Sequence, residues 1–431
     1  MKVAIVGAGV AGLGAAWTLA PDHEVVIYER QPRIGGHALT VAIPGWPSTT
    51  GLDGGFLLFD DWQYPAFSAL LRELQVPVDP AAVSVAYSGR FGAWSTFEKN
   101  TSLWRQVEHE AIRFTRDSPR IAMLPRDTSL QTYLHEHSYS EAFTHACLLP
   151  LIGVLLVNRA AQLDVPAWIV GAGFSRFFSF FAPTTSFRVR GGTRRYLTAM
   201  QQRLRATIVC GRNVTAVRRD DDGVWLHAEG EEAPQRFDRL IIAANAQAAL
   251  RLLQDPSELE REVLGACTIE TTHIIVHRDA TALTATSAAG NALFHYKDLS
   301  TAAADTIGKG QCTVAIDTGE ASAYITWDAP TGAIAADTVI TRFELEHTVY
   351  STRWAAITTN SFPKIQGVRR TYFCGGHSAG YPSHEGALVS GVAAAIAAGG
   401  TFPWPQDRRA FAAVQQVRRL YHVSRDDPAS A

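Results

Sequence analysis

The apolar positions along this chain fall into three blocks of short strands, separated by two longer stretches of different character. In the first block, residues 2–6 form an apolar run, residues 10–19 are mostly small, and residues 24–28 are apolar again. This pattern predicts a buried strand, a closely packed helix and a second buried strand. The other two blocks predict strands at 187–190, 207–210, 214–219, 223–228, 237–245 and 371–374 and helices at 196–204 and 386–398.

The two intervening stretches predict a second domain. Residues 61–185 are rich in aromatic side chains, and residues 276–364 alternate between strand-like and polar segments. We therefore expect residues 1–60, 186–275 and 365–431 to form one discontinuous domain, and the two intervening stretches to form the other. The chain would then pass repeatedly between the two domains.

A run of phenylalanines ends the first intervening stretch. Phe174, Phe177, Phe178 and Phe181 have the spacing of one helical face. The ordinary interpretation of such a stripe is a hydrophobic core, and the alternative is the wall of a hydrophobic tunnel. A tunnel would suit an acyl or isoprenoid chain better than a small polar amine.

A glycine-rich turn joins the first strand to the first helix and predicts a dinucleotide site. Gly7 permits a tight turn, Gly9 lets the backbone approach a pyrophosphate, and Gly12 lets the helix lie close to the sheet. We expect these glycines and Ala11 to line the site, because the start of the helix also offers free N–H groups to phosphates. Glu29 ends the second strand, where a carboxylate accepts bonds from an adenosine ribose.

A second glycine pair favours FAD over NAD. Gly35 and Gly36 follow Glu29 and Arg30 closely and allow the chain to pass the pyrophosphate again. FAD enzymes of the glutathione-reductase type generally have such a pair, and NAD dehydrogenases generally lack it. We therefore expect FAD as the cofactor, with Arg30 beside the ribose-binding acid.

Composition excludes several classes of function. The formal net charge is −2, so no nucleic-acid partner is expected. The five cysteines are scattered without a CxxC pair, which argues against a disulfide framework and a metal site. The apolar run at 148–157 is too short to span a bilayer, and a strand beginning at residue 2 leaves no room for a signal peptide. We expect a cytoplasmic protein, with peripheral membrane contact left open.

Several segments resemble the flavin-containing amine oxidase and phytoene desaturase superfamily, in particular a bacterial branch found with cyclopropane-fatty-acid-type methyltransferases. The segments that carry the resemblance are Asp53–Phe59 with Tyr64 and Pro65, Arg176–Phe178, Val189–Tyr196, Thr271–His273, His277–Asp279, Phe373–Gly375 and His384–Gly386. The resemblance implies an α/β fold, in which a glutathione-reductase-type Rossmann FAD-binding domain is interwoven with an α+β substrate domain. It also implies that FAD is held non-covalently.

The resemblance also implies which residues contact the cofactor. His37 is expected near the pyrophosphate or the flavin, and Glu385 near the ribityl chain or the pyrophosphate. Asp53 either bonds the cofactor or caps a turn. The remaining expected contacts are Gly54, Gly55, Phe56, Val214, Ala243, Gly375, Gly376, Gly386 and Ala387. In two respects the sequence departs from the superfamily: Gly376 stands where an acid is common, and Lys297 is only a weak candidate for a lysine near flavin N5.

The candidate catalytic residues lie around the last predicted helix. His377 and His384 flank the expected flavin ring and have side chains that titrate near neutral pH. Tyr381 is expected to wall the substrate pocket. The helix dipole and the free N–H groups at Gly386 and Ala387 would stabilise negative charge at the flavin edge.

These features predict an FAD-dependent oxidoreductase that abstracts a hydride from a hydrophobic substrate, with O₂ as a candidate electron acceptor. Three alternatives stay open: an amine oxidase acting on a C–N bond, a redox-neutral double-bond isomerase, and a non-catalytic flavoprotein partner of a methyltransferase. An NAD-dependent dehydrogenase is disfavoured by Gly35 and Gly36.

Overall fold

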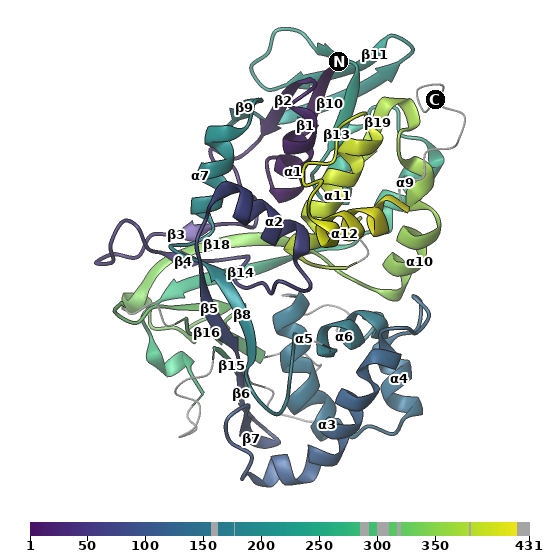
Figure 1. Cartoon of the computed structure of the whole chain (residues 1–431). Helices are drawn as coiled ribbons and strands as arrows, with labels where there is room; N and C mark the ends of the chain where they lie inside the picture. Colours follow the sequence, from purple (N-terminus) through teal and green to yellow (C-terminus); the bar gives the residue numbers. More distant parts are fainter. Residues whose placement is uncertain are drawn as a thin grey trace.

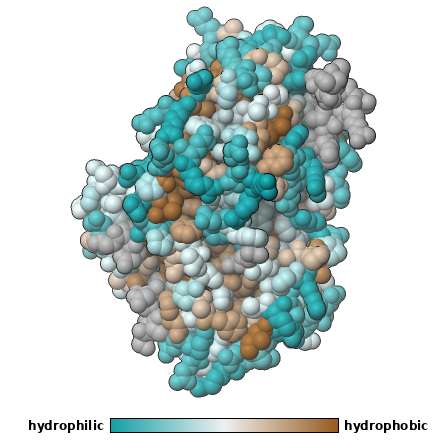
Figure 2. All heavy atoms as spheres, in the orientation of Figure 1, coloured by the Kyte–Doolittle hydropathy of each residue, from teal (hydrophilic) through white to brown (hydrophobic). Residues whose placement is uncertain are grey.

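The protein consists of two halves, one above the other in Figure 1. The computed structural model describes residues 1–156, 163–175, 177–284, 293–299, 310–316, 320–378 and 381–419. The upper half contains the chain's first strand and its last helices, and the lower half contains most of the helices from α3 to α6 (Figure 1). In this view the outer surface is largely hydrophilic with small, separate hydrophobic patches (Figure 2).

A five-stranded parallel sheet forms the centre of the upper half, in the order β19-β13-β1-β2-β9. Val3, Ala4 and Ile5 have no exposed surface, because helices cover both faces of such a sheet. The strands are β1 (Lys2–Val6), β2 (Glu24–Glu29), β9 (Thr207–Cys210), β13 (Arg239–Ile242) and β19 (Thr371–Phe373).

Several further elements complete the upper half. An antiparallel sheet contains β10 (Val214–Asp220), β11 (Gly223–Ala228) and β12 (Gln235–Phe237). The single strand predicted at 237–245 is therefore two short strands in different sheets. The helices are α1 (Val10–Leu19), α2 (Pro65–Leu74), α7 (Arg194–Arg203), α8 (Ala246–Leu252), α9 (Glu258–Gly265), α11 (His384–Ala397) and α12 (Arg408–Arg418).

A seven-stranded mixed sheet supports the other half, in the order β18-β14-β17-β16-β15-β6-β7. The pairing of β6 with β15 joins the two chain stretches that were expected to share a domain, which supports the interwoven fold. The strands are β6 (Val85–Gly89), β7 (Gly92–Ser95), β14 (Ile269–His277), β15 (Phe294–Asp298), β16 (Gly310–Val314), β17 (Tyr324–Trp327) and β18 (Val339–Thr348).

Helices and two strand pairs surround this sheet and connect it to the upper half. The helices are α3 (Ser102–Ile121), α4 (Leu130–Glu136), the π-helix η1 (Phe143–Leu148), α5 (Leu149–Leu156), α6 (Ala167–Phe174) and α10 (Thr352–Asn360). The pairs are β3 (Thr40–Val41) with β4 (Leu52–Asp53) and β5 (Val78–Val83) with β8 (Thr184–Val189). No helix among the described residues has both the length and the apolar character needed to cross a membrane.

The dividing lines between the halves differ from the predicted ones at two places. Strand β14 belongs to the seven-stranded sheet from Ile269 onward, although 275 was the expected boundary. Helix α2 was expected in the substrate domain but packs against α11 and α12 of the upper half. Tertiary contacts decide both boundaries, and neither is marked by a change in composition.

The predicted phenylalanine stripe is not helical. Helix α6 ends at Phe174, so the helical spacing of the later phenylalanines has no meaning. Phe178 and Phe180 are nevertheless buried, whereas Phe181 is 38% exposed. The ring of Phe180 lies 4.8 Å from that of Phe174 and 5.6 Å from that of Phe143, so these side chains form part of the core. Arg176 lies outside the described residues.

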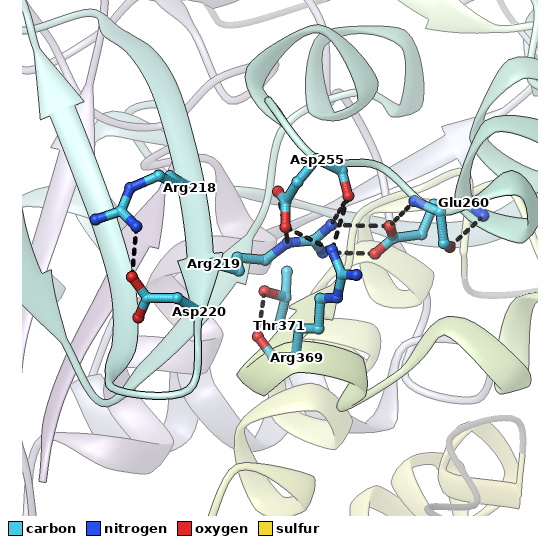
Figure 3. A network of polar contacts seen from close by, with 8 residues as sticks. Arg218, Arg219, Asp220, Asp255, Glu260, Arg369 and Thr371 are labelled. Atoms are coloured by element: carbon cyan, nitrogen blue, oxygen red, sulfur yellow. Dashed lines mark hydrogen bonds and ion pairs between the residues drawn. The ribbon is translucent and has the colours of Figure 1, made fainter.

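A buried ion pair joins the small antiparallel sheet to α9 (Figure 3). Arg219 donates to both carboxylate oxygens of Glu260, at 2.6 and 2.9 Å, and neither side chain is more than 1% exposed. Asp255 lies 3.2 Å from Arg219 and 2.6 Å from Arg369, so it extends the network toward the surface. The arrangement fixes β10, α9 and the start of β19 relative to one another.

Replacing Arg219 with methionine is expected to lower the free energy of unfolding by about 3–5 kcal/mol, because Glu260 would keep a buried charge without a partner. The matched control is Arg218→Met in the adjacent position, where the pair with Asp220 is exposed and worth about 0–1 kcal/mol. Urea unfolding of both variants measures the difference. Equal losses in the two variants would show that the buried pair does not stabilise the fold.

Candidate active site

The turn between β1 and α1 leaves open space beside one of its three glycines. Gly7 has a φ of +103°, and a Cβ there would lie 2.8 Å from the carbonyl oxygen of Ala243. A Cβ on Gly12 would lie 1.9 Å from the carbonyl oxygen of Gly7. A Cβ on Gly9 would meet no atom within 4 Å. Contacts with other protein atoms therefore explain why positions 7 and 12 are glycine. Gly9, in contrast, borders space in which another molecule can approach the backbone.

The second glycine pair crosses the first at this point. The N–H of Gly35 donates to the carbonyl of Ala8 at 2.8 Å. Gly36 has a φ of +56°, and a Cβ on it would lie 3.2 Å from the Cα of Gly9. The two glycine segments thus meet at the N-terminus of α1, which has a partial positive charge that suits a phosphate group.

The acid at the end of β2 lies against the same turn. Glu29 accepts hydrogen bonds from the N–H groups of Ala8 at 2.7 Å and Gln31 at 2.9 Å. Val214 begins the nearby strand β10, and its side chain is buried. Arg30 is directed elsewhere, since it forms an exposed ion pair with Glu346 of β18 at 3.6 Å.

The segment from Asp53 to Phe56 holds the strands around the site together. Asp53 accepts bonds from the hydroxyl of Thr40 at 2.6 Å and from the N–H and hydroxyl of Thr193 at 2.9 and 2.8 Å. Of its two predicted roles, the structure therefore supports the turn cap, here at the start of α7. Burial raises the pKa of Asp53 to about 6.

Gly54 and Gly55 serve the contact between the two halves. A Cβ on Gly54 would lie 2.3 Å from the ring of Phe343, and one on Gly55 would lie 2.2 Å from the carbonyl oxygen of His37. Both glycines allow β18 to lie against the segment that contains the second glycine pair. Their contacts in this structure are therefore with protein atoms.

Two groups of histidine and aromatic rings lie next to this segment. The ring of His384 stacks on Phe56 with centroids 3.9 Å apart, and its Nε2 lies 3.0 Å from the hydroxyl of Tyr196. His37 donates from Nε2 to the carbonyl of Glu346 at 3.0 Å, and its ring lies 4.8 Å from that of His347. Burial lowers the pKa of His384 and of His347 to about 3, so both are neutral at pH 7.

His37 has an exposed side chain beside these rings. The surrounding protein lowers its pKa through desolvation. Because its Nε2 carries a proton toward a carbonyl, Nδ1 is an acceptor in the neutral ring.

His377 lies apart from these rings. Its side chain packs edge-on against Phe362, 6.0 Å away, and is 2% exposed with no partner at Nε2. Gly375, in the same turn, has a φ of +134°. A Cβ on Gly376 would lie 3.2 Å from the hydroxyl of Tyr350, so this side of the glycine faces protein. The expectation that His377 flanks the same ring system as His384 has no support in these contacts.

Glu385, Gly386 and Ala387, which were expected to contact the cofactor, have hydrogen-bond partners within the protein. Helix α11 begins at His384, two residues earlier than predicted. The N–H groups of Gly386 and Ala387 both bond to Ser383, at 2.9 and 3.0 Å. Glu385 accepts from the N–H groups of Ala66 at 2.7 Å and Phe67 at 2.8 Å, so it caps α2.

The burial of Glu385 predicts that stability falls with rising pH. Desolvation raises its pKa from 4.5 to about 8, outweighing the two bonds that favour the charged form. A raised pKa in the folded state stabilises the fold fully below pH 4.5, and this contribution is lost as the pH rises through 8. At ~1.4 kcal/mol per pKa unit, the loss is several kcal/mol.

Urea unfolding at pH 5 to 9 should show the decline in the free energy of unfolding, and Glu385→Gln should make that free energy nearly independent of pH. Glu344→Gln, at an exposed position, is the control. If the free energy of unfolding fell with pH as steeply in Glu385→Gln as in Glu344→Gln, Glu385 would not be the cause of the decline.

Unpartnered polar atoms gather where α6 approaches the segment before α11. Tyr381 has a buried hydroxyl without a partner, and its ring lies 6.3 Å from that of Trp168, whose Nε1 is also buried and unpartnered. Burial raises the pKa values of Tyr381 and Tyr64, and the nearby charge of Asp60 adds to both effects. The role of Tyr381 as a wall of the substrate pocket stays a prediction.

The sequence did not reveal all of these residues. His347, Tyr196 and Trp168 each lie on an element with an ordinary pattern, and only tertiary packing brings them to the site. Lys297 donates to the backbone of Thr281, away from the glycine turns. Among the described residues, no cluster of three or more His, Cys, Asp or Glu side chains is arranged to hold a metal ion.

Comparison with known proteins agrees with this arrangement. A protein family described as an NAD(P)-binding Rossmann-like domain matches residues 5–74. A putative flavin-containing monoamine oxidase of Mycobacterium tuberculosis, AofH, is 40% identical over 81 residues, which are 19% of this chain and 17% of that protein. The chain therefore matches less than a fifth of the length of this curated relative.

Two solved structures share the whole fold. A double mutant of putrescine oxidase superimposes with a TM-score of 0.68 at 16% identity and covers 92% of this chain and 98% of its own. A fatty acid isomerase from P. acnes gives a TM-score of 0.66 at 15% identity, over 90% and 96% of the two chains. Residues 5–74 are therefore similar to an NAD(P)-binding Rossmann-like domain, and the whole chain shares the α/β fold of these two solved structures.

Proposed function

We propose that this protein is an FAD-dependent oxidoreductase that abstracts a hydride from a hydrophobic substrate. The main observation behind this proposal is the open space beside Gly9, where the segment containing Gly36 passes close to the backbone. The fold and the flavin-containing relative add support. In this proposal FAD is held without a covalent bond.

The residues present fit this cofactor. Gly9 and Gly36 leave room for a pyrophosphate at the positive end of α1, and Glu29 is near enough to the same turn to bond a ribose. The ring end of the cofactor would lie toward His37, Phe56 and His384. FAD, when bound, accepts a hydride from a substrate carbon and passes the electrons to an acceptor, for which O₂ is our candidate.

The protein side of the site is neutral and largely apolar. His384 and His347 are uncharged at pH 7, so neither supplies a positive charge. The dipole at the N-terminus of α11 remains as the source of positive potential. The ring of Phe56 stacks on His384, whose side chain is half-buried and lies within hydrogen-bond distance of the Tyr196 hydroxyl. Such surroundings suit a hydride transfer, which needs little acid or base assistance.

Two other reactions are supported by the relatives' names. AofH and putrescine oxidase favour oxidation of a C–N bond, and the fatty acid isomerase favours a redox-neutral shift of a double bond. We place the hydrophobic C–H substrate first, because the rings of Phe56 and Phe67 that lie against His384 are apolar.

Anaerobic titration of the purified protein tests the proposal. Bleaching of the flavin absorbance by fatty-acyl compounds, and not by alkyl amines of equal length, is the expected result. Bleaching by amines alone would establish the amine oxidase instead. A flavin that no compound reduces, in a protein that still changes the double-bond position of an added unsaturated acid, would establish the isomerase.

A further inference from the structure

Arg126 lies in the turn between α3 and α4 with an unused set of donors. Its guanidinium carbon is 3.7 Å from the ring centroid of Trp168. Among the described residues, it has no hydrogen-bond or ion-pair partner. The residue is exposed at the surface, and partial desolvation of the guanidinium lowers its pKa. A guanidinium that stacks through its face keeps the N–H groups at its edge free to donate.

Trp168 adds a second donor at the same place. Its side chain is 7% exposed, and the buried Nε1 has no acceptor. An indole N–H can only donate, and leaving such a group buried and unpaired is unfavourable. Both neighbouring side chains therefore lack an acceptor, which is the group that a ligand would have to supply.

A row of aromatic rings leads from this place toward the candidate active site. The ring of Tyr381 lies 6.3 Å from that of Trp168, and Tyr381 precedes α11 by three residues. Tyr64, which adjoins Tyr381, has its ring 6.0 Å from that of Phe56, which stacks on His384. The rings of this row carry no polar group other than hydroxyls and fit a hydrocarbon chain, with the carboxylate of Asp60 lying beside Tyr64 and Tyr381.

We propose that Arg126 and Trp168 bind the carboxylate of the substrate, with the apolar chain lying along the aromatic row toward His384. This inference rests on the proposed function and names its substrate class as a long-chain carboxylic acid. A carboxylate offers only acceptors, and its bonds to a guanidinium are charge-assisted and often paired. An ammonium group at the same end would meet the positive charge of Arg126.

Calorimetric binding of decanoate, decanol and decylamine to the whole flavin-loaded protein tests this site. Arg126→Gln is expected to weaken decanoate binding about tenfold, the loss of ~1.4 kcal/mol from one charge-assisted pair, and to leave decanol unchanged. Arg120→Gln is the matched control, because it removes an exposed arginine from the same helical region. Trp168→Phe keeps a ring under the guanidinium and should weaken decanoate alone.

The outcomes separate this inference from the proposed function. Equal decanoate affinities in Arg126→Gln and Arg120→Gln, or tighter binding of decylamine than of decanoate, would overturn the carboxylate site. If the protein binds decanoate through Arg126 but its flavin absorbance is never bleached, the carboxylate site is supported and the proposed hydride transfer is overturned. Binding is read without turnover, so one result does not depend on the other.

Discussion

Replacing Gly9 with alanine is expected to weaken FAD binding by about 10- to 100-fold without lowering the stability of the flavin-free protein. A new Cβ would meet no protein atom within 4 Å, and the backbone at Gly9, with φ −71° and ψ 176°, is open to alanine. The same methyl group would occupy the space proposed for the pyrophosphate, where overpacking costs about 1–3 kcal/mol. Flavin binding by fluorescence titration and urea unfolding of the flavin-free form measure the two effects separately.

The matched control for this substitution is Gly265→Ala, at the end of α9. Its Cβ would also meet nothing within 4 Å, and the site is remote from both glycine turns. This variant should bind FAD as tightly as the unchanged protein. If Gly9→Ala also bound FAD normally, the cofactor would not approach the chain at this turn.

Replacing Gly391 with alanine is expected to destabilise the fold by about 3 kcal/mol or more. Gly391 lies in the middle of α11, where helix propensity alone favours alanine by about 1 kcal/mol. Its Cβ, however, would lie 2.0 Å from the carbonyl oxygen of Ala11 in α1. A backbone atom cannot move aside as a flexible side chain can, so the two helices would have to separate. The steric cost outweighs the gain in propensity.

Urea unfolding measures this second effect as well. Gly265→Ala again provides the comparison, since it adds a methyl group to a helix without a clash and should be neutral or slightly stabilising. A Gly391→Ala protein as stable as that control would mean that α1 and α11 are not in such close contact. The small residues of α11 would then need another explanation.

The local part of the fold could be predicted from the sequence because it depends on short-range patterns. Strand β1 and helix α1 have the expected bounds, and Gly7 and Gly12 have the backbone contacts that a tight turn and a close helix require. The interwoven arrangement also followed from the spacing of apolar blocks. The fold boundaries at α2 and β14 could not be predicted, because a helix or strand looks the same whichever sheet it packs against.

The side-chain contacts of the site were predicted less well. The resemblance implied that Glu385 lies near the ribityl chain or the pyrophosphate of the cofactor. The structure instead directs its carboxylate to the N-terminus of α2, a partner 318 residues away in the chain. His347 gave no signal at all, because its proximity to His37 depends on how β18 crosses the glycine segment. Contacts of this kind arise from the tertiary fold and leave no local pattern.

The cofactor content of the purified protein tests whether this chain is an FAD enzyme. We expect a yellow protein that releases one molecule of FAD per chain on denaturation, with the flavin identified by chromatography. Release without proteolysis would also establish that no covalent bond holds the flavin. A colourless protein that takes up no FAD, and instead binds NAD at the Gly9 turn, would overturn the assignment of FAD.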